Sequence, residues 1–182
     1  MVPFIAPRLK RFSKEENGAI SVEALMMLPL LFWAFLAVFT FLDAYRANAL
    51  NLKAAYTIGD LVSRETEVIN NTYIDSMATV FGLMTKPGSE SRVRISVVHY
   101  DEDTDGYYLD WSANRGFTNA MDDDRLAEIR DRLPIMPDEE RVILVETSNT
   151  YVPPFAVGVN ITDMENLVFT RPRFTGLVRA EL

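Results

Sequence analysis

A long apolar segment that follows directly after an acidic residue constrains this chain more than any other feature. Residues 24–42, ALMMLPLLFWAFLAVFTFL, contain no charged side chain over 19 positions. As an α-helix with a rise of about 1.5 Å per residue, this segment would measure roughly 28 Å, close to the thickness of a bilayer's hydrocarbon core. The segment therefore predicts one membrane-spanning helix, followed by a folded domain of ordinary size.

Glu23 lies at the N-terminal edge of this apolar segment. An unpaired carboxylate at that depth in a bilayer is unfavourable by several kcal/mol, so acidic residues in such places usually have a partner charge. We therefore expect Glu23 to be paired, and the identity of its partner bears on function.

Charge is distributed unevenly along the chain. Residues 1–18 carry a net charge of +2, whereas the whole chain carries −8, so that residues 19–182 are strongly acidic. A basic segment before an apolar helix predicts a cytoplasmic N-terminus and an exported C-terminal domain. The acidic domain argues against nucleic acid and anionic lipid headgroups as partners. Because the chain has no cysteine, disulfides and thiolate chemistry are excluded.

Hydrophobic periodicity predicts the elements of the first half of the chain. Apolar residues recur every three or four positions as far as Val62, which predicts one continuous helix over about residues 19–65. A second, short helix is expected around Tyr73–Met84, after a segment rich in helix-capping residues. Alternation at Val93–Val97 predicts a strand, and Tyr107–Trp111 would return as its hairpin partner.

In the second half, helix and strand signals continue to alternate. Met121–Leu133 reads as a helix with acidic residues in its first turn and basic residues in its last. Arg141–Val152 is rich in β-branched residues and predicts a central strand, and shorter strands are expected at Leu167–Arg173 and Thr175–Val178. The predicted fold class is α+β: a long N-terminal helix, transmembrane in its first half, packed on a small antiparallel sheet with one or two further helices.

An acidic turn lies between the two strands of the predicted hairpin. Asp101, Asp103 and Asp105, followed by Gly106, form the pattern D-x-D-x-D-G, the first half of a calcium-binding loop. The twelfth position of such a loop needs a bidentate acid, but here it is Ser112. A solvated hairpin turn is the favoured interpretation, with calcium binding as the alternative.

Catalytic signals are weak in this sequence. The single histidine, His99, falls at the end of a predicted strand beside the acidic turn, where a structural or surface role is expected. No serine has the context of a nucleophile elbow or an S-x-x-K motif, and no phosphate-binding loop or dinucleotide motif is present. We therefore predict that the protein is not an enzyme and that it has no resident cofactor, calcium excepted.

The leader and helix together resemble a known class of exported subunits. The pattern G-A-I-S-V-E at residues 18–23, followed by an apolar helix with Pro29, resembles the TadE/TadG-like minor pseudopilins of the tight-adherence (Tad or Flp) type IV pilus. VILVETSNTYVPPF (142–155) and RPRF (171–174) are similar to the family more loosely. Ala24 departs from the pattern, because an aromatic residue commonly follows the glutamate in this family.

The resemblance implies that a prepilin peptidase cuts after Gly18 and makes Ala19 the new N-terminus, so that Glu23 is the fifth residue of the mature chain. The new α-ammonium would then lie one helical turn from Glu23, or beside the carboxylate of a neighbouring subunit. Such a buried pair sets register more than it adds stability. Glu23 would thereby take part in assembly through charge pairing.

The same resemblance implies a pilin-like fold and a role in a pilus that serves adhesion and biofilm formation. Residues 1–18 would be a cleaved cytoplasmic leader, 19–43 a transmembrane and assembly helix, and 44–182 an exported domain. The protein would be a single-pass protein of the inner membrane with a periplasmic C-terminal domain, and entry into the extracellular filament stays open. Its partners would be the prepilin peptidase, other pseudopilins and pilins, and the inner-membrane assembly platform.

An alternative from another functional class stays open at this point. The chain could be an uncleaved single-pass membrane protein whose external domain binds a ligand, calcium or a cell-wall partner. Peptidase-dependent processing distinguishes the two hypotheses.

Overall fold

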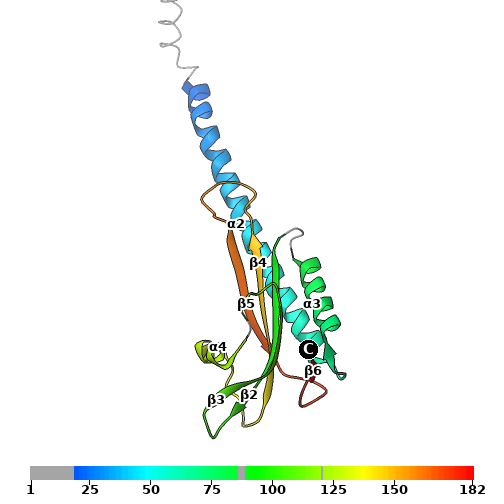
Figure 1. Ribbon diagram of the computed structural model, residues 1–182. Helices are drawn as coiled ribbons and strands as arrows, with labels where there is room; N and C mark the ends of the chain where they lie inside the picture. Colours follow the sequence, from blue (N-terminus) through cyan, green and yellow to red (C-terminus); the bar gives the residue numbers. More distant parts are fainter. Residues whose placement is uncertain (1–18, 86–88, 120) are drawn as a thin grey trace, which may run out of the picture. The chain divides into compact units, whose positions relative to one another are not determined.

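The structure is a computed structural model that describes residues 19–85, 89–119 and 121–182. Its longest element is helix α2, Ala19–Ser63, which has Pro29 in its interior (Figure 1). The predicted long helix is therefore confirmed. The chain forms two compact units: one contains α2 as far as Asp43 together with Pro154–Val159, and the other contains Ala44–Pro153 and Asn160–Leu182.

The larger unit is built on a four-stranded antiparallel sheet of order β3-β2-β4-β5 (Figure 1). Its strands are β2 (Ser91–Asp101), β3 (Gly106–Arg115), β4 (Arg141–Tyr151) and β5 (Thr162–Thr170). The predicted β2–β3 hairpin and the central position of β4 are confirmed. The long helix and the antiparallel sheet together make the fold α+β, as expected.

Helix α3, Asn71–Met84, is the predicted second helix. The side chain of Asn70 caps its N-terminus, because Oδ1 of Asn70 accepts a hydrogen bond of 3.0 Å from the backbone N–H of Tyr73. This bond satisfies one of the N–H groups that the first helical turn leaves without an intrahelical partner.

The predicted helix at residues 121–133 is shorter than expected. Helix α4 covers only Asp123–Glu128, and a 3₁₀ turn, η2, follows at Arg130–Arg132. Asp122 caps α4 by accepting from the N–H of Arg125 at 2.9 Å. The last turn tightens because Leu133 N–H bonds to the carbonyl of Arg130, three residues back rather than four.

The prediction of strands at the C-terminus needs a correction. Strand β5 begins and ends earlier than expected. It pairs with β4 from Ile143 to Tyr151 and stops before Pro172, which has no N–H to donate. Thr175–Val178 is not a strand. Instead β6, Ala180–Glu181, pairs in parallel with an unexpected two-residue strand, β1, Ile69–Asn70.

Two hydrophobic cores lie on opposite faces of the four-stranded sheet. The first joins the second half of α2 and helix α3 to alternate residues of the strands, and it includes Ala54, Ala55, Ile58, Val62, Ile74, Met77, Phe81, Val93, Ile95, Val97, Ile143, Val145 and Val168. The second lies under α4 and η2 and includes Val98, Met121, Leu126, Leu133, Met136, Val142 and Leu144. Period-two alternation thus divides each central strand between the two cores.

Candidate functional site

The candidate site is the surface of helix α2 from Val22 to Leu42, which we call the apolar helix surface. Fourteen large apolar side chains on it are between 48% and 76% exposed, namely Val22, Leu25, Met26, Met27, Leu28, Leu30, Leu31, Phe32, Trp33, Phe35, Val38, Phe39, Phe41 and Leu42. A helix that is apolar on all sides is stable only in lipid or among other apolar helices. Within the part of the chain that the structure describes, α2 alone is long and apolar enough to cross a membrane.

Glu23 is the only charged residue on this surface, and it is exposed. The helical backbone begins at Ala19, so the nitrogen of Ala19 and Glu23 are separated by one turn, about 6 Å along the axis. The predicted processing residue Gly18 lies outside the described residues. The spacing needed for pairing an amine at Ala19 with Glu23 is therefore present in the helix.

Near its C-terminal end, the apolar helix surface meets the segment Pro154–Val159 of the same compact unit. The rings of Phe39 and Phe155 are in edge-to-face contact, with centroids 5.9 Å apart and planes at 66°. Thr40 is fully buried, and its hydroxyl donates a hydrogen bond of 2.9 Å to the carbonyl of Leu36. The internal bond satisfies a polar group inside an otherwise apolar region.

In the larger unit, Asn51 fastens α2 to the sheet. Asn51 is fully buried; its Nδ2 donates to the carbonyl of Met164 on β5, and its Oδ1 accepts from Oγ1 of Thr147 on β4 at 2.8 Å. We did not predict this anchor. Its signal in the sequence is an amide at a position four residues before the buried Ala55 on the same helix face.

A second fastening joins the end of α2 to the chain after β5. Asp60 pairs with Arg173 at 2.9 Å and with Arg64 at 3.0 Å, and the N–H of Arg173 donates to the carbonyl of Ser63 at 2.8 Å. Arg173 belongs to the RPRF segment, so this segment has a defined structural contact in the fold.

Arg94 on β2 forms the most deeply buried ion pair among the described residues. Its side chain is 1% exposed, and its Nη1 lies 2.6 Å from Oε2 of Glu146 on β4. Nη2 donates to the carbonyl of Asn119 at 2.5 Å, and the guanidinium lies over the ring of Phe117, 4.6 Å from its centroid. Arg125 approaches the other oxygen of Glu146 at 3.6 Å.

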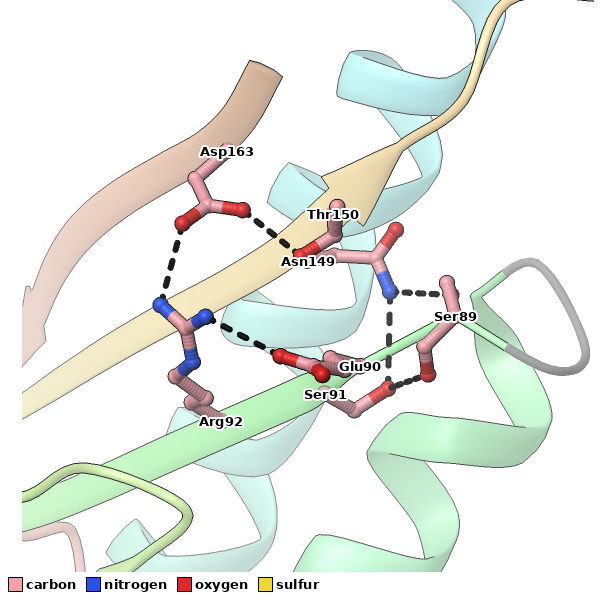
Figure 2. A network of polar contacts seen from close by, with 7 residues as sticks. All are labelled: Ser89, Glu90, Ser91, Arg92, Asn149, Thr150 and Asp163. Carbon is pink, nitrogen blue, oxygen red and sulfur yellow. Dashed lines mark hydrogen bonds and ion pairs between the residues drawn. The ribbon is translucent and has the colours of Figure 1, made fainter. Parts of the chain in front are cut away.

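A polar network crosses the sheet at the start of β2 (Figure 2). Arg92 donates to Asp163 on β5 at 3.0 Å and to Glu90 at 3.3 Å, while Oγ1 of Thr150 on β4 donates to Asp163 at 2.6 Å. The hydroxyl of Thr150 and the guanidinium of Arg92 hold the pKa of Asp163 below its usual value. Hydrogen bonds to the two carboxylates raise the pKa of Arg92.

The same network continues to the segment before β2. Nδ2 of Asn149 donates to Oγ of Ser89 at 2.7 Å and to Oγ of Ser91 at 3.4 Å (Figure 2). These bonds connect the end of β4 with the start of β2, at the end of the sheet where the chain leaves β4.

The acidic turn between β2 and β3 is held by its own hydrogen bonds. Oδ1 of Asp101 accepts from the backbone N–H groups of Asp103 at 2.9 Å and Thr104 at 3.3 Å. Oδ1 of Asp105 accepts from the hydroxyl of Tyr100 at 2.8 Å and from Arg130 at 2.6 Å. These bonds, that of Tyr100 first, lower the pKa of Asp105.

These bonds bear on the predicted calcium ligands. Across the residues that the structure describes, no three acidic or histidine side chains form a group that could hold a metal ion, so Asp101, Asp103 and Asp105 are not brought together as a ligand set. The hairpin that the acidic turn closes is present as expected. In this arrangement the turn has the structural role that the sequence favoured, and calcium binding stays the alternative hypothesis.

The side chain of His99, near the end of β2, contacts two residues of β3. Its Nδ1 lies 2.8 Å from Oδ1 of Asp110, and its ring stacks on Tyr108 with centroids 5.8 Å apart. Arg141 on β4 pairs with the other oxygen of Asp110 at 3.0 Å. The histidine is therefore part of a polar cluster that connects β2, β3 and β4 through Asp110.

Comparison of the chain with protein-family models, with curated proteins and with solved structures finds no match. The apolar helix surface and Glu23 are therefore the features of the molecule that bear on its function.

Proposed function

We propose that this protein is a minor pseudopilin that acts in the assembly of a Tad/Flp-type pilus and is processed by a prepilin peptidase after Gly18. The observation that carries the proposal is the apolar helix surface, which is exposed over most of its length, with its single carboxylate one helical turn from Ala19. A simple membrane anchor requires the apolar residues alone, and a carboxylate at Glu23 would only destabilise it in the bilayer. In an assembly helix, the same carboxylate can pair with a charge on this or a neighbouring subunit.

Cleavage supplies the missing partner charge. The α-ammonium of Ala19 would neutralise Glu23 within the same helix or between neighbouring subunits, which offsets much of the unfavourable burial of either charge. The apolar helix surface then serves first as a membrane anchor and later as a packing surface for other subunits. Because a buried charge is compensated only when its partner lies beside it, Glu23 would fix the axial register of the packed helices.

The layout of α2 supports a pilin-like assignment. Its first half is apolar and exposed, and its second half buries Ala54, Ile58 and Val62 against an antiparallel sheet. One half of this helix is therefore available to lipid or to other helices, while the other half packs on the domain. This is the arrangement that a subunit needs if it is to move from the bilayer into a filament. The proposed role needs no catalysis.

In this proposal the mature protein is a single-pass protein of the inner membrane, with its N-terminus at the cytoplasmic face and residues 44–182 in the periplasm. Its partners are sister pseudopilins and pilins and the inner-membrane assembly platform. Passage into the extracellular pilus follows if the helix leaves the bilayer together with those partners.

Processing tests the proposal directly. The full chain is co-expressed with the prepilin peptidase of the same system, extracted from membranes and measured by intact mass. We expect loss of residues 1–18, and no loss with a catalytically inactive peptidase or in Gly18→Val. A full-length mass in the presence of active peptidase would contradict the proposal and favour the uncleaved single-pass protein.

A further inference from the structure

The loop between β4 and β5, Val152–Ile161, has an unusual composition for an exposed connection. Its sequence, VPPFAVGVNI, contains no charged residue, in a chain of which 24% is charged. Val152, Phe155 and Ile161 are 51%, 41% and 65% exposed. Large apolar side chains gathered in one uncharged loop mark a contact surface, because soluble loops are usually polar.

Phe155 relates this loop to the membrane span. Phe155 and Phe39 belong to the same compact unit and are in edge-to-face contact, with centroids 5.9 Å apart. Phe39 lies four residues before Asp43, the first charged residue after the apolar segment, which is about 6 Å along the helix axis. If α2 spans the bilayer, Phe39 lies at the boundary between acyl chains and headgroups, and Phe155 lies at the same depth.

The backbone of the loop suits that depth. Non-helical backbone near the hydrocarbon region is unfavourable where its N–H groups have no partner. Pro153 and Pro154 have no N–H group, and the N–H of Val157 donates to the carbonyl of Phe155 at 3.0 Å. At three positions of the loop, therefore, no backbone N–H group is left in need of a water partner.

We propose that the segment Pro154–Val159 of this loop, with Phe155 as its exposed large apolar side chain, inserts into the bilayer interface at the C-terminal end of the span and forms a second membrane contact beside α2. The occupant of this surface is lipid. Since the loop is uncharged, insertion requires apolar burial but no anionic headgroup, which is compatible with the acidic composition of the domain. The proposal depends on α2 crossing the membrane and is independent of pilus assembly.

Because the chain has no cysteine, single cysteines can report the depth of chosen positions. Ala156 is exposed in the loop, Leu31 is exposed in the middle of the span, and Thr104 is exposed in the hairpin turn at the opposite end of the sheet. The full-length variants Ala156→Cys, Leu31→Cys and Thr104→Cys are labelled with the fluorophore NBD. Each is reconstituted into phosphatidylcholine vesicles that carry doxyl quenchers either near the headgroups or deep in the acyl chains.

We expect the label at position 156 to show blue-shifted emission and roughly a twofold loss of intensity with the shallow quencher, as for a group 5–10 Å or so into the interface. The label at position 31 should respond to the deep quencher, and that at position 104 to neither. Water-like emission at position 156 would overturn the proposal. A blue shift at position 156 without quenching would also overturn it, because protein and not lipid would then cover the loop.

Discussion

Nη1 of Arg94 lies 2.6 Å from Oε2 of Glu146. This ion pair lies on the face of the sheet that α4 and η2 cover, and the arginine side chain is only 1% exposed there. A buried ion pair adds little net stability relative to apolar residues of the same shape, but loss of one partner leaves a buried charge without compensation. Loss of either residue should therefore weaken the association of β2 with β4.

Glu146→Ala should lower the free energy of unfolding by about 3 kcal/mol, because the guanidinium of Arg94 would keep only Asn119 and the ring of Phe117 as partners. The double variant Arg94→Met/Glu146→Leu should recover most of that loss. Urea unfolding of the full chain in detergent, followed by near-UV circular dichroism, measures both. Arg132→Ala, an exposed arginine on η2, is the control and should change stability by at most about 0.5 kcal/mol. A double variant no more stable than Glu146→Ala would contradict this account.

Asn51→Leu should destabilise the domain by about 1–3 kcal/mol, since the carbonyl of Met164 and the hydroxyl of Thr147 would lose their buried partner. Hydrogen exchange should report faster opening of β5 than of β3, because the amide of Asn51 bonds to β5 directly. Lys53→Ala, an exposed change two residues along the same helix, should have almost no effect. Equal losses from both variants would mean that α2 is held by apolar packing alone.

Asp105 should make stability depend on pH in the acid range. Its pKa is lowered in the folded state, so the unfolded chain takes up the proton first, and the contribution of Asp105 is present above its ordinary value of 3.8 and lost as the pH falls through the folded pKa. Asp105→Asn should therefore be less stable than the parent chain near pH 7, and the difference should shrink near pH 3. Urea midpoints at both pH values measure this. Asp103→Asn serves as the matched control in the same turn, and a difference that grew on acidification would have the wrong sign.

If the proposed processing takes place, Glu23→Ala should leave membrane insertion unchanged and abolish pilus assembly, since removal of the carboxylate makes the helix more apolar but removes the proposed partner of the Ala19 amine. Membrane fractionation and counting of surface pili measure the two effects separately. Glu67→Ala, an exposed acid after the end of α2, should assemble normally. Normal piliation of cells that carry Glu23→Ala would remove the proposed role of this residue.

Calcium titration of the full chain should give no binding heat at millimolar concentration. To ligate the ion, Asp105 would have to give up its bonds to Tyr100 and Arg130, and Asp101 would have to release two backbone N–H groups. Isothermal calorimetry decides the matter. Heat that disappears in Asp103→Asn would establish a site at this turn and restore the calcium hypothesis.

Features that depend on neighbours in sequence could be predicted well. The long helix follows from apolar spacing of three and four, and the β2–β3 hairpin follows from period-two alternation around a D-x-D-x-D-G turn. The cap at Asn70 follows from its residue type and position. Each of these signals is carried by residues close together in the sequence, so it does not depend on tertiary contacts.

Features that depend on distant partners could not be predicted in this way. β1 and β6 are two residues each, and so short a strand has no periodicity to detect. The bonds of Asn51 to Thr147 and Met164 join residues 96 and 113 positions apart, and they exist only because strand register brings those groups under the helix. The tightening of the expected 121–133 helix into η2 likewise depends on where the chain must return to the sheet.

The sequence by itself therefore determined an apolar helix with Glu23 at its edge and the α+β class of the domain. Both depend on composition and on the spacing of apolar residues, which are properties of neighbouring residues in the chain. Only the tertiary structure decided that Arg94 meets Glu146, that Asn51 fastens α2 to two strands, and that Phe155 contacts Phe39. Such contacts depend on the register of strands and on the path of loops, which no local pattern of residues encodes.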